Sequence, residues 1–547
     1  MKKLRIYHLA ILFIFLLQPT SVFPQYQEIY NAVQEKIKSE LESGVTHIGN
    51  DLLYTPDRLN NYYSKHNYEP LWFQKENREE LIEIIRNAYV EGLNPTDYHL
   101  ERIEDLENQM TGGNRDIDLL ANLELLLSDA VVLYSYHLLW GKVDQSKIRK
   151  DWDIPENPKP AGLDSLFANY KYNNNLTEFF ERLKPRHYMY VQLREGLKLY
   201  RNIAENGGWP SIPDGEVLKP GMTNERIPVI RGYLTVTGDL QTADLVEDSV
   251  ATLFDKELEQ AVKTFQFRHN LSQDGVIGKG TLAQINVPVE KRMDMIRVNM
   301  ERARWVLQQL EPDFLVVNIA GFNIRRVKND SIVFFSPVIV GRLHHESPVF
   351  KGKMTYIELN PTWTLPYSIA TKETLPKLQK DPSYLAKKNM IIMDRDGKKL
   401  DPSTIDFSKY SRGNFPFIIR QEPGPHNALG QVKFMFPNKY SVYLHDTPAR
   451  SLFSREDRAF SHGCIRLDKK WELLMNLMNE PDVWNMEKIN EIIKTEKTTR
   501  ITLPQPIDIV ILYWTAGADK EARLFFNKDI YNRDEAVLKA LNGPVTL

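Results

Sequence analysis

Apolar residues recur every three or four positions through the first two hundred residues of the chain, which is the spacing of amphipathic helices. The longest such run covers residues 117–140, and a second one over residues 79–89 ends near Gly92, a residue type that often closes a helix. This pattern predicts a helical scaffold domain over residues 25–215 that carries no chemistry. Its tryptophans are expected in the core, rather than stacked on a sugar: Trp72, Trp140 and Trp152.

Residues 117–140 are the most apolar stretch after the N-terminus, and they are long enough to cross a membrane. They contain three acidic residues, Asp118, Glu124 and Asp129, whose charges are costly in lipid. The stretch is therefore predicted to be a buried helix of a water-soluble domain.

A short linker and a compact unit follow the predicted scaffold. Residues 202–220 are rich in Gly and Pro and are interpreted as a linker. Residues 221–290 show three short apolar runs that predict helices. Asp255 is the expected N-cap of the middle helix, and Asp274-Gly275 marks a tight turn before the last one.

The pattern changes after a further predicted helix over residues 297–310. Short runs rich in β-branched and aromatic residues then predict a mostly β domain within residues 297–515. Residues 370–417 interrupt this pattern with a charged helical stretch and a polar loop, and long insertions of this kind often act as lids. Residues 516–547 form a C-terminal segment, so the expected fold class is multidomain α+β. The predicted strands are residues 314–320, 322–327, 331–340, 354–359, 432–436, 440–445 and 507–514.

Composition narrows the range of functions. The chain has 547 residues, of which 42% are hydrophobic and 26% charged, as in ordinary globular proteins. A net charge of −2 gives no electrostatic support for nucleic-acid binding. One cysteine excludes a disulfide framework and CxxC zinc sites. No metal cofactor is expected, because the 12 histidines form no dense ligand tract.

The N-terminus indicates export. Residues 1–24 combine a basic start, an apolar run at residues 9–17 and a polar break, which is typical of a Sec-type signal peptide. The run is short for a membrane span, but the cleavage site is poorly defined, so an uncleaved anchor is the alternative. The expected location is the periplasm of a diderm bacterium.

The single cysteine, Cys464, lies in residues 461–467 (SHGCIRL). Free cysteines are often inert core residues, but this one follows Gly463 and has polar neighbours. His445 lies 19 residues upstream, at the end of a predicted strand. Positive charge nearby lowers the pKa of a thiol. Cys464 is therefore predicted to be a nucleophile, with His445 as its base.

Several neighbours are candidates for supporting roles. Side chains alternate between the two faces of an extended segment. Tyr443 and His445 therefore share one face of their segment, and Cys464 and Arg466 share one face of theirs. The backbone N–H groups of Gly463 and Cys464 are candidate oxyanion donors. Arg466 is predicted to hold the loop or bind a substrate carboxylate. The other candidates are His462, as a loop-fixing helper or as the less favoured base; Ser461 and Asp446, as supporting groups; and Tyr443 and Trp363, as groove-lining or core side chains.

These residues also resemble known families. His445 followed by SHGCIRL resembles the signature of the L,D-transpeptidase (YkuD-type) catalytic domain. Residues 360–366 (NPTWTLP) and 427–434 (NALGQVKF) resemble two further motifs of that domain. Residues 261–286 resemble the three-helix peptidoglycan-binding module, which places that domain at residues 221–290. The whole chain is most similar to the large, YcbB-like periplasmic members with a scaffold and a lidded catalytic domain.

The resemblance implies a mechanism without metal or nucleotide. Cys464 would attack a stem tetrapeptide, release D-Ala and form a thioester, while the backbone carbonyl of Asp446 orients the ring of His445. An amine of a second stem would then complete a 3→3 cross-link. The implied partners are peptidoglycan stems and glycan, and other cell-wall synthesis enzymes, for a monomeric protein. The resemblance also implies acylation by carbapenems.

Two alternatives remain open at this point. Attack of water on the same thioester would make the protein an L,D-carboxypeptidase. A non-catalytic wall-binding scaffold would keep residues 221–290 and lose Cys464 or His445, yet both are present. A cysteine amidase or endopeptidase is disfavoured, because those enzymes place the cysteine before the histidine.

Overall fold

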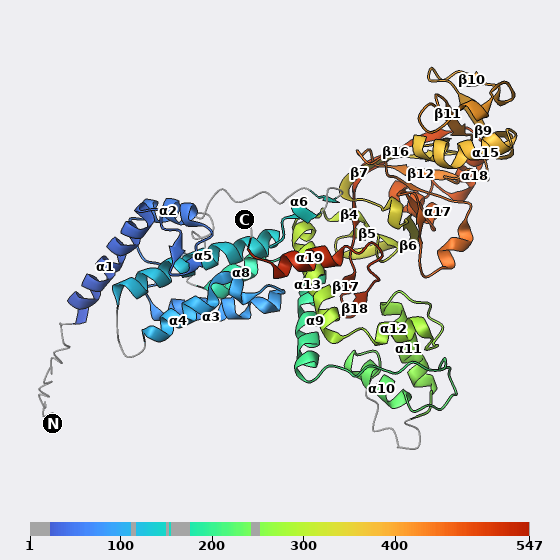
Figure 1. The fold of residues 1–547 in the computed structure, drawn as a ribbon. Coiled ribbons are helices and arrows are strands. Elements are labelled where there is room, and N and C mark those ends of the chain that lie inside the picture. The colour runs from blue at the N-terminus through green and yellow to red at the C-terminus, as the bar shows by residue number, and fades with distance from the viewer. Residues whose placement is uncertain (1–21, 111–115, 149–151, 155–174, 242–251, 546–547) are drawn as a thin grey trace, which may run out of the picture.

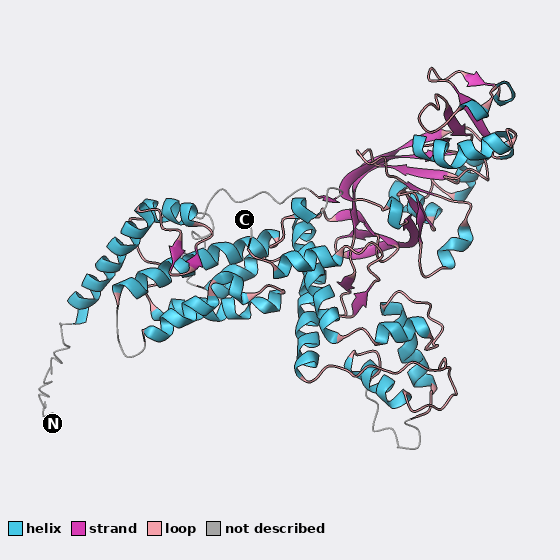
Figure 2. Ribbon diagram, in the orientation of Figure 1, coloured by secondary structure: helices cyan, strands magenta, loops and turns pink. Residues whose placement is uncertain are grey.

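The structure is a computed structural model that describes residues 22–110, 116–148, 152–154, 175–241 and 252–545. The chain forms an elongated helical region, a small helical unit and a β-rich domain that carries an insertion (Figure 1 and Figure 2). This arrangement confirms the predicted multidomain α+β fold class. Residues 1–21, which hold most of the predicted signal peptide, lie outside the described residues.

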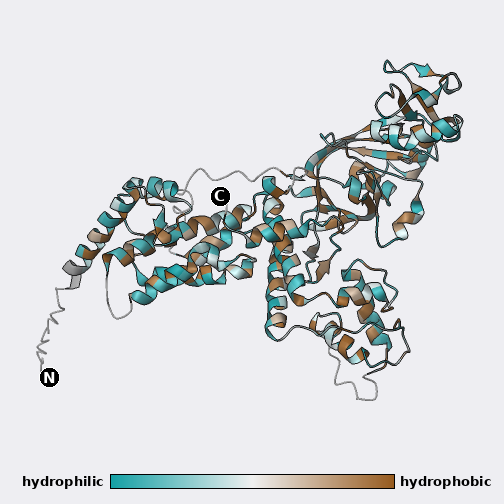
Figure 3. Ribbon diagram, in the orientation of Figure 1, coloured by the Kyte–Doolittle hydropathy of each residue, from teal (hydrophilic) through white to brown (hydrophobic). Residues whose placement is uncertain are grey.

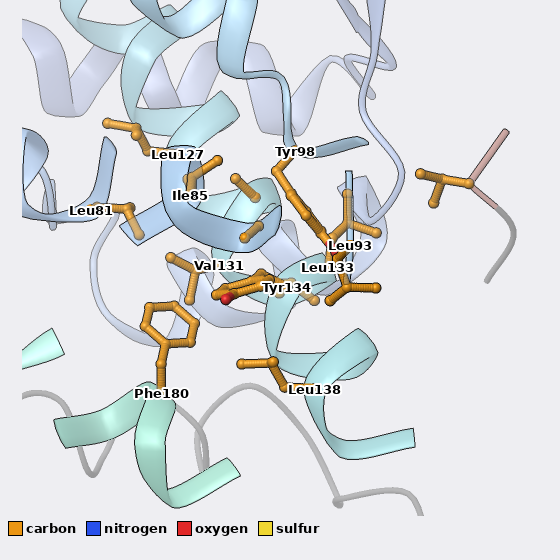
Figure 4. Close-up of a cluster of buried hydrophobic side chains, with 14 of the residues drawn as sticks. Leu81, Ile85, Leu93, Tyr98, Leu127, Val131, Leu133, Tyr134, Leu138 and Phe180 are labelled. Atoms are coloured by element: carbon orange, nitrogen blue, oxygen red, sulfur yellow. The ribbon is translucent and has the colours of Figure 1, made fainter. Parts of the chain in front are cut away.

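The helical region is organised around α5 (Ile117–Trp140), which is buried along most of its length. Hydrophobic residues predominate along this helix (Figure 3), and Leu127, Val131 and Tyr134 pack with side chains of neighbouring helices (Figure 4). Trp72 joins this core, as predicted. The surrounding helices are α1 (Val22–Glu42), α2 (Pro56–Lys65), α3 (Lys75–Arg86), α4 (Leu100–Gln109) and α8 (Leu176–Leu183).

The acidic residues of α5 explain why so apolar a helix belongs to the protein interior. Glu124 and Asp129 are buried, and backbone N–H groups of the preceding loops donate hydrogen bonds to them, which replaces their lost hydration. The donors are Leu71 and Trp72 for Glu124, at 2.6 and 2.9 Å, and Tyr54 and Thr55 for Asp129, at 2.9 and 2.8 Å. In the part of the chain that is described, no helix is both long and apolar enough to cross a membrane.

Two helices, α9 (Tyr188–Glu205) and α13 (Val289–Val306), join the helical region to the rest of the molecule. α13 begins directly after Pro288, whereas the sequence predicts a start at residue 297. Proline is tolerated at this position because the first N–H groups of a helix have no partner within the helix. The C-terminal elements pack against these helices, and Arg302 of α13 forms a 2.6 Å ion pair with Asp534. These elements are β17 (Ala516–Ala518), β18 (Leu524–Phe526) and α19 (Asp534–Asn542).

The small unit contains the short helices α10 (Ile227–Val236), α11 (Lys256–Arg268) and α12 (Lys279–Ile285). Asp255 caps α11, as predicted, by accepting a 2.8 Å hydrogen bond from the N–H of Leu258. At the end of α11, the buried Arg268 pairs with Asp239 and donates to the carbonyl of Leu524 in β18. This arginine therefore fastens the unit to the C-terminal hairpin.

The β-rich domain is a closed barrel. Its strands follow the order β12-β13-β15-β6-β5-β4-β16-β7, and β12 also pairs with β7, which closes the ring. Inward side chains form one hydrophobic core, while alternate residues face outward. The strands are β4 (Asp313–Asn318), β5 (Asn323–Lys328), β6 (Ser331–Gly341), β7 (Val349–Leu359), β12 (Val432–Met435), β13 (Leu444–His445), β15 (Ile465–Leu467) and β16 (Thr499–Leu512).

β13 is shorter than the strand predicted over residues 440–445. Only its last two residues belong to the ladder, because Ser441 has a φ of +54° that breaks the extended backbone before them. β16 is longer than predicted, since the residues from Thr499 onward already pair with β7.

The insertion is wider than the predicted residues 370–417. It contains a sheet of order β10-β9-β11-β8, in which β8 (Trp363–Thr364) pairs with β11 (Ile418–Gln421). The remaining strands, β9 (Met390–Met393) and β10 (Lys399–Leu400), lie in the region predicted to be a polar loop. The insertion has a hydrophobic core of its own, which includes Leu378, Leu385, Ile392, Phe407 and Ile419.

Candidate active site

Parallel pairing of β13 with β15 brings the predicted nucleophile and base into one neighbourhood. Leu444 is opposite Ile465 and His445 is opposite Arg466. Leu444 and Ile465 point into the barrel core, so His445 and Arg466 point outward. Tyr443 and Cys464 precede His445 and Arg466 by two positions, so their side chains lie on the same outer side. The N–H of Ile465 donates to the carbonyl of Tyr443 at 3.1 Å, which continues the pairing of the two segments.

Cys464 and His445 are therefore diagonal neighbours on adjacent strands, a separation that an imidazole ring can bridge. The partly exposed thiol lies 3.8 Å from the carbonyl oxygen of Ser441, and the side chain of Tyr443 is beside it. The ring of Tyr443 packs edge-on against that of His445, with centroids 5.7 Å apart. Within the described residues, no hydrogen bond joins the thiol directly to the imidazole, and a substrate has to bring these groups together.

The surroundings of His445 define its protonation. The ring is 5% exposed, and its Nδ1 lies 2.5 Å from the carbonyl oxygen of Asp446. A carbonyl can only accept, so Nδ1 carries the proton and Nε2 keeps a free lone pair. Burial, assisted by the positive charge of Arg466, lowers the pKa of His445 to about 3. The ring is therefore a neutral base at physiological pH.

The pKa of the Cys464 thiol is shifted in the direction opposite to the one expected from the sequence. Burial raises the pKa of Cys464, and this effect outweighs the opposing effects of the Tyr443 hydrogen bonds and the charges of Lys433 and Arg466. The expected lowering by nearby positive charge is present but is smaller than the cost of desolvating a thiolate. Cys464 and His445 are thus a neutral pair at rest, not an ion pair.

Lys433 is a member of this site that the sequence analysis missed as a site residue. It is opposite His445 in the antiparallel β12–β13 pair, its Nζ lies 4.2 Å from the ring centroid of Tyr443, and it is 3.7 Å from Glu358. The signal was available in the alternation of residues 432–434, where two inward apolar residues flank an outward lysine. A second positive charge therefore faces the thiol beside Arg466.

Arg466 has an unusual environment for an arginine. Its Nε is buried without a hydrogen-bond partner, and its guanidinium has no ion pair among the described residues. Burial also lowers the pKa of its side chain. An unpaired guanidinium next to a nucleophile is suited to hold a carboxylate of a ligand.

The turn from Ser461 to Cys464 is held by its own polar atoms. The Ser461 hydroxyl donates to the carbonyl of Cys464 at 2.5 Å and accepts from the N–H of Gly463 at 3.1 Å. The N–H of Gly463, predicted to serve an oxyanion, is therefore already engaged, which leaves the N–H of Cys464 as the available donor. Gly463 has a φ of +112°, a conformation that favours glycine.

His462 contacts the insertion instead of the thiol. Its Nε2 lies 2.7 Å from Glu373 of the insertion and 2.8 Å from a guanidinium nitrogen of Arg342. The ring of His345 is 5.0 Å away. In the described ranges, no three His, Cys, Asp or Glu side chains are grouped to hold a metal ion. This placement suits His462 to fixing the loop and the insertion.

Tyr443 and Asp446 are held by neighbours from other segments. The Tyr443 hydroxyl lies near Trp363, the first residue of β8, and burial raises the pKa of that hydroxyl. The Asp446 carboxylate accepts from the Lys470 ammonium at 2.5 Å. It also lies against Gly430, where a φ of +64° and the lack of space for a Cβ both require glycine. Asp446 therefore fixes the chain next to His445, whereas Trp363 connects the site to the insertion.

Comparisons with known families cover three segments of the chain. Residues 312–493 match a family described as "L,D-transpeptidase catalytic domain". Residues 57–197 match a family described as "Scaffold domain", and residues 230–285 match one described as "Putative peptidoglycan binding domain". The catalytic-domain match contains both His445 and Cys464.

A relative named "Putative L,D-transpeptidase", from Haemophilus influenzae, is 31% identical over 257 residues, which are 46% of this chain and 51% of the relative. The chain thus matches about half the length of this curated relative.

Solved structures of L,D-transpeptidases from Xylanimonas cellulosilytica and Stackebrandtia nassauensis are also similar, at 13% and 12% identity. Each similarity covers 55% of this chain, and 99% and 96% of the solved chains respectively. The TM-scores of 0.18 and 0.21 are too low to carry an argument. Along the chain, the matches to a scaffold domain and a peptidoglycan-binding domain thus precede the match to an L,D-transpeptidase catalytic domain, and residues 312–493 are the part of this chain that resembles that family.

Proposed function

We propose that the protein forms 3→3 cross-links between peptidoglycan stem peptides through a thioester on Cys464. The observation that carries this proposal is the shared outer face of β13 and β15. A thiol, a neutral imidazole and an unpaired guanidinium lie there together, within a segment that matches an L,D-transpeptidase catalytic domain.

In the first half of the reaction, Nε2 of His445 takes the proton of Cys464 while Sγ attacks the carbonyl carbon before the terminal D-Ala. The N–H of Cys464 would donate to the developing oxyanion, since the N–H of Gly463 is already engaged. The bond to D-Ala then breaks, the imidazolium returns the proton to the leaving amine, and a thioester remains. The thiol of Cys464 and the imidazole of His445 are both neutral before the reaction. Opposite charges therefore develop on them only during attack, next to the side chains of Tyr443 and Lys433.

In the second half, an amine from another stem attacks the thioester. His445 removes the proton of this amine, the C–S bond breaks, and the leaving thiolate takes that proton from the imidazolium. Exchange of one amide for another needs no external energy source. Attack by water at the same carbon would instead release a tripeptide.

Arg466 has a role in substrate binding within this proposal. The leaving D-Ala has a free carboxylate, and the unpaired guanidinium of Arg466 is a suitable partner for it. In this proposal the insertion covers the bound stem as a lid, and the contact of Glu373 with His462 beside Cys464 supports that role.

Peptidoglycan as substrate is supported by the peptidoglycan-binding family match over residues 230–285. A peptidoglycan substrate in turn supports an exported protein that acts in the periplasm.

The test is incubation of the protein with a defined disaccharide-tetrapeptide, followed by mass analysis of protein and products. We expect an acyl adduct on the protein, free D-Ala and a cross-linked dimer. The variant Cys464→Ala is expected to form neither adduct nor dimer. An adduct that persists in this variant would overturn the assignment of the nucleophile, and tripeptide as the only product would favour a carboxypeptidase.

A further inference from the structure

A cavity of about 810 Å³ lies on the outer surface of the barrel, and Cys464 is not among its lining residues. Three parts of the molecule form its walls. The small helical unit contributes residues 267–273, the barrel contributes outer residues of β5 and β6, and the C-terminal hairpin contributes β17 and β18. One wall thus belongs to the segment that matches a peptidoglycan-binding domain.

Large apolar side chains of this groove remain exposed. Phe335 of β6 is 47% exposed, Ile332 is 50% exposed, and Phe267 of the helical unit is 49% exposed. Phe267 stacks edge-on against Phe525 of the hairpin, with centroids 5.5 Å apart. Exposed aromatic rings in a concave surface are typical of binding sites, since their burial by a ligand is favourable.

The groove also presents arginine side chains that are not engaged in ion pairs with carboxylates of the described residues. Among the described residues, Arg325, Arg455 and Arg458 form no ion pair, and the Nε atoms of Arg325 and Arg458 are buried without a partner. Arg325 lies over the ring of Phe335, at 5.9 Å.

The acidic residues in the lining are already engaged. Glu456 accepts a 2.8 Å hydrogen bond from the N–H of Ser272, and Asp519 pairs with Arg523 at 2.8 Å, with Glu521 at 3.6 Å from the same arginine. The groove as a whole is therefore complementary to an anionic ligand with apolar faces.

The groove is connected to the catalytic site through one stretch of chain. Residues 446–463 link His445 to Cys464, and the middle of this link, residues 454–458, lines the groove. Pro337 in the groove is two positions along β6 from Ile339, which is opposite Arg466. A ligand in the groove thus contacts the same link that carries the base and the nucleophile at its two ends.

We propose that this groove binds a glycan strand through its carboxylate-bearing stem peptides, and so holds the polymer beside the catalytic site. The sugar rings would pack against Phe335 and Phe267, and the stem carboxylates would pair with Arg325, Arg455 and Arg458. This inference rests on the proposed function for the nature of the polymer. It adds a binding site that spans the helical unit, the barrel and the hairpin.

The test measures binding of soluble, un-cross-linked glycan chains that retain their stem peptides. All variants are made in the full-length Cys464→Ala protein, so that no turnover occurs. We expect Phe335→Ser and Arg455→Glu each to weaken binding by about tenfold. Both side chains are substantially exposed, so folding should be retained, as a thermal melt would verify. The matched control is Leu199→Ser on α9, where the replaced side chain is 48% exposed and lies outside the groove.

Chains from which an amidase has removed the stem peptides are the second probe, and they are expected to bind more weakly to the parent protein. The inference is wrong if the parent binds no chains, if the groove variants bind as tightly as Leu199→Ser, or if stem-free chains bind as tightly as complete ones. Its failure is distinguishable from failure of the proposed function, because binding here needs no thioester and the acyl adduct is measured on the unmodified protein.

Discussion

Buried polar groups occur in both the scaffold and the catalytic barrel, but their surroundings differ. In α5, Asp129 is fully buried and receives hydrogen bonds from two backbone N–H groups, a threonine hydroxyl and the ring of His99. On the outer face of the barrel, Arg466 has a buried nitrogen with no partner, and the thiol of Cys464 is held in its neutral form. Buried polar groups with all their hydrogen-bond partners, such as Asp129, stabilise the fold. We call these saturated groups, and we call those that lack partners, such as Arg466, open groups, because they are available to a ligand.

The largest effect that this comparison predicts is at Cys464. The substitution Cys464→Ala removes the proposed nucleophile, so turnover should fall on the order of 10⁴-fold or more. The melting temperature should hardly change, because the side chain is small and partly exposed. Turnover assays and thermal melts measure the two effects. A variant that still forms cross-links would show that the open groups of this face do not perform the reaction.

His445 and His462 provide the next test, because they differ in their contacts. His445→Ala should lower turnover by about 10²- to 10⁴-fold, since the proposed general base is lost. His462→Ala should lower it only several-fold, because this ring contacts Glu373 and Arg342 rather than the thiol. Steady-state rates of the two variants measure the difference. The reverse order would assign the base to His462.

The sequence predicts those features of the scaffold and of the barrel site that depend on residues close together in the chain. Alternation along residues 443–445 and 464–466 is enough to place two pairs of side chains on outward faces, and the acidic residues of α5 are enough to exclude a membrane span. Both conclusions depend only on spacing within one segment and on the cost of exposing charge to lipid.

The parts that it does not predict depend on segments far apart in the chain. The raised pKa of Cys464 results from burial by several strands and loops, which outweighs charges that are visible nearby in the sequence. The position of Lys433 opposite His445 depends on the β12–β13 register. The true extent of the insertion depends on pairing between β8 and β11, whose residues lie more than fifty positions apart.

A third prediction tests the saturated side of the comparison. Asp129→Ala should destabilise the scaffold by about 3 kcal/mol, because it leaves buried N–H groups without acceptors. Asp118→Ala is the matched control in the same helix. That carboxylate is 70% exposed and pairs with Lys36 at the surface, so its loss should cost less than about 1 kcal/mol.

Hydrogen exchange along α5 measures both changes. The rate of acyl-adduct formation by folded Asp129→Ala, at a temperature below its melting point, should remain that of the parent. A slower adduct in the folded variant would show that the saturated network also serves the chemistry, which would remove the distinction between the two regions.

The smallest effect concerns the neutral state of the thiol. Because burial raises the pKa of Cys464, the thiolate fraction is low at neutral pH, and the rate of alkylation by iodoacetamide should keep rising with pH beyond the range where an ordinary cysteine, with a pKa of about 8.5, levels off. Lys433 lowers this pKa. Its replacement in Lys433→Met should therefore shift the profile to higher pH and slow alkylation several-fold at neutral pH, whereas Lys433→Arg should stay near the parent. A profile that levels off at or below that of a free cysteine would mean that the positive charges of the outer face outweigh burial. Cys464 would then be a thiolate at rest, and the barrel face would already hold a charged pair before any substrate binds.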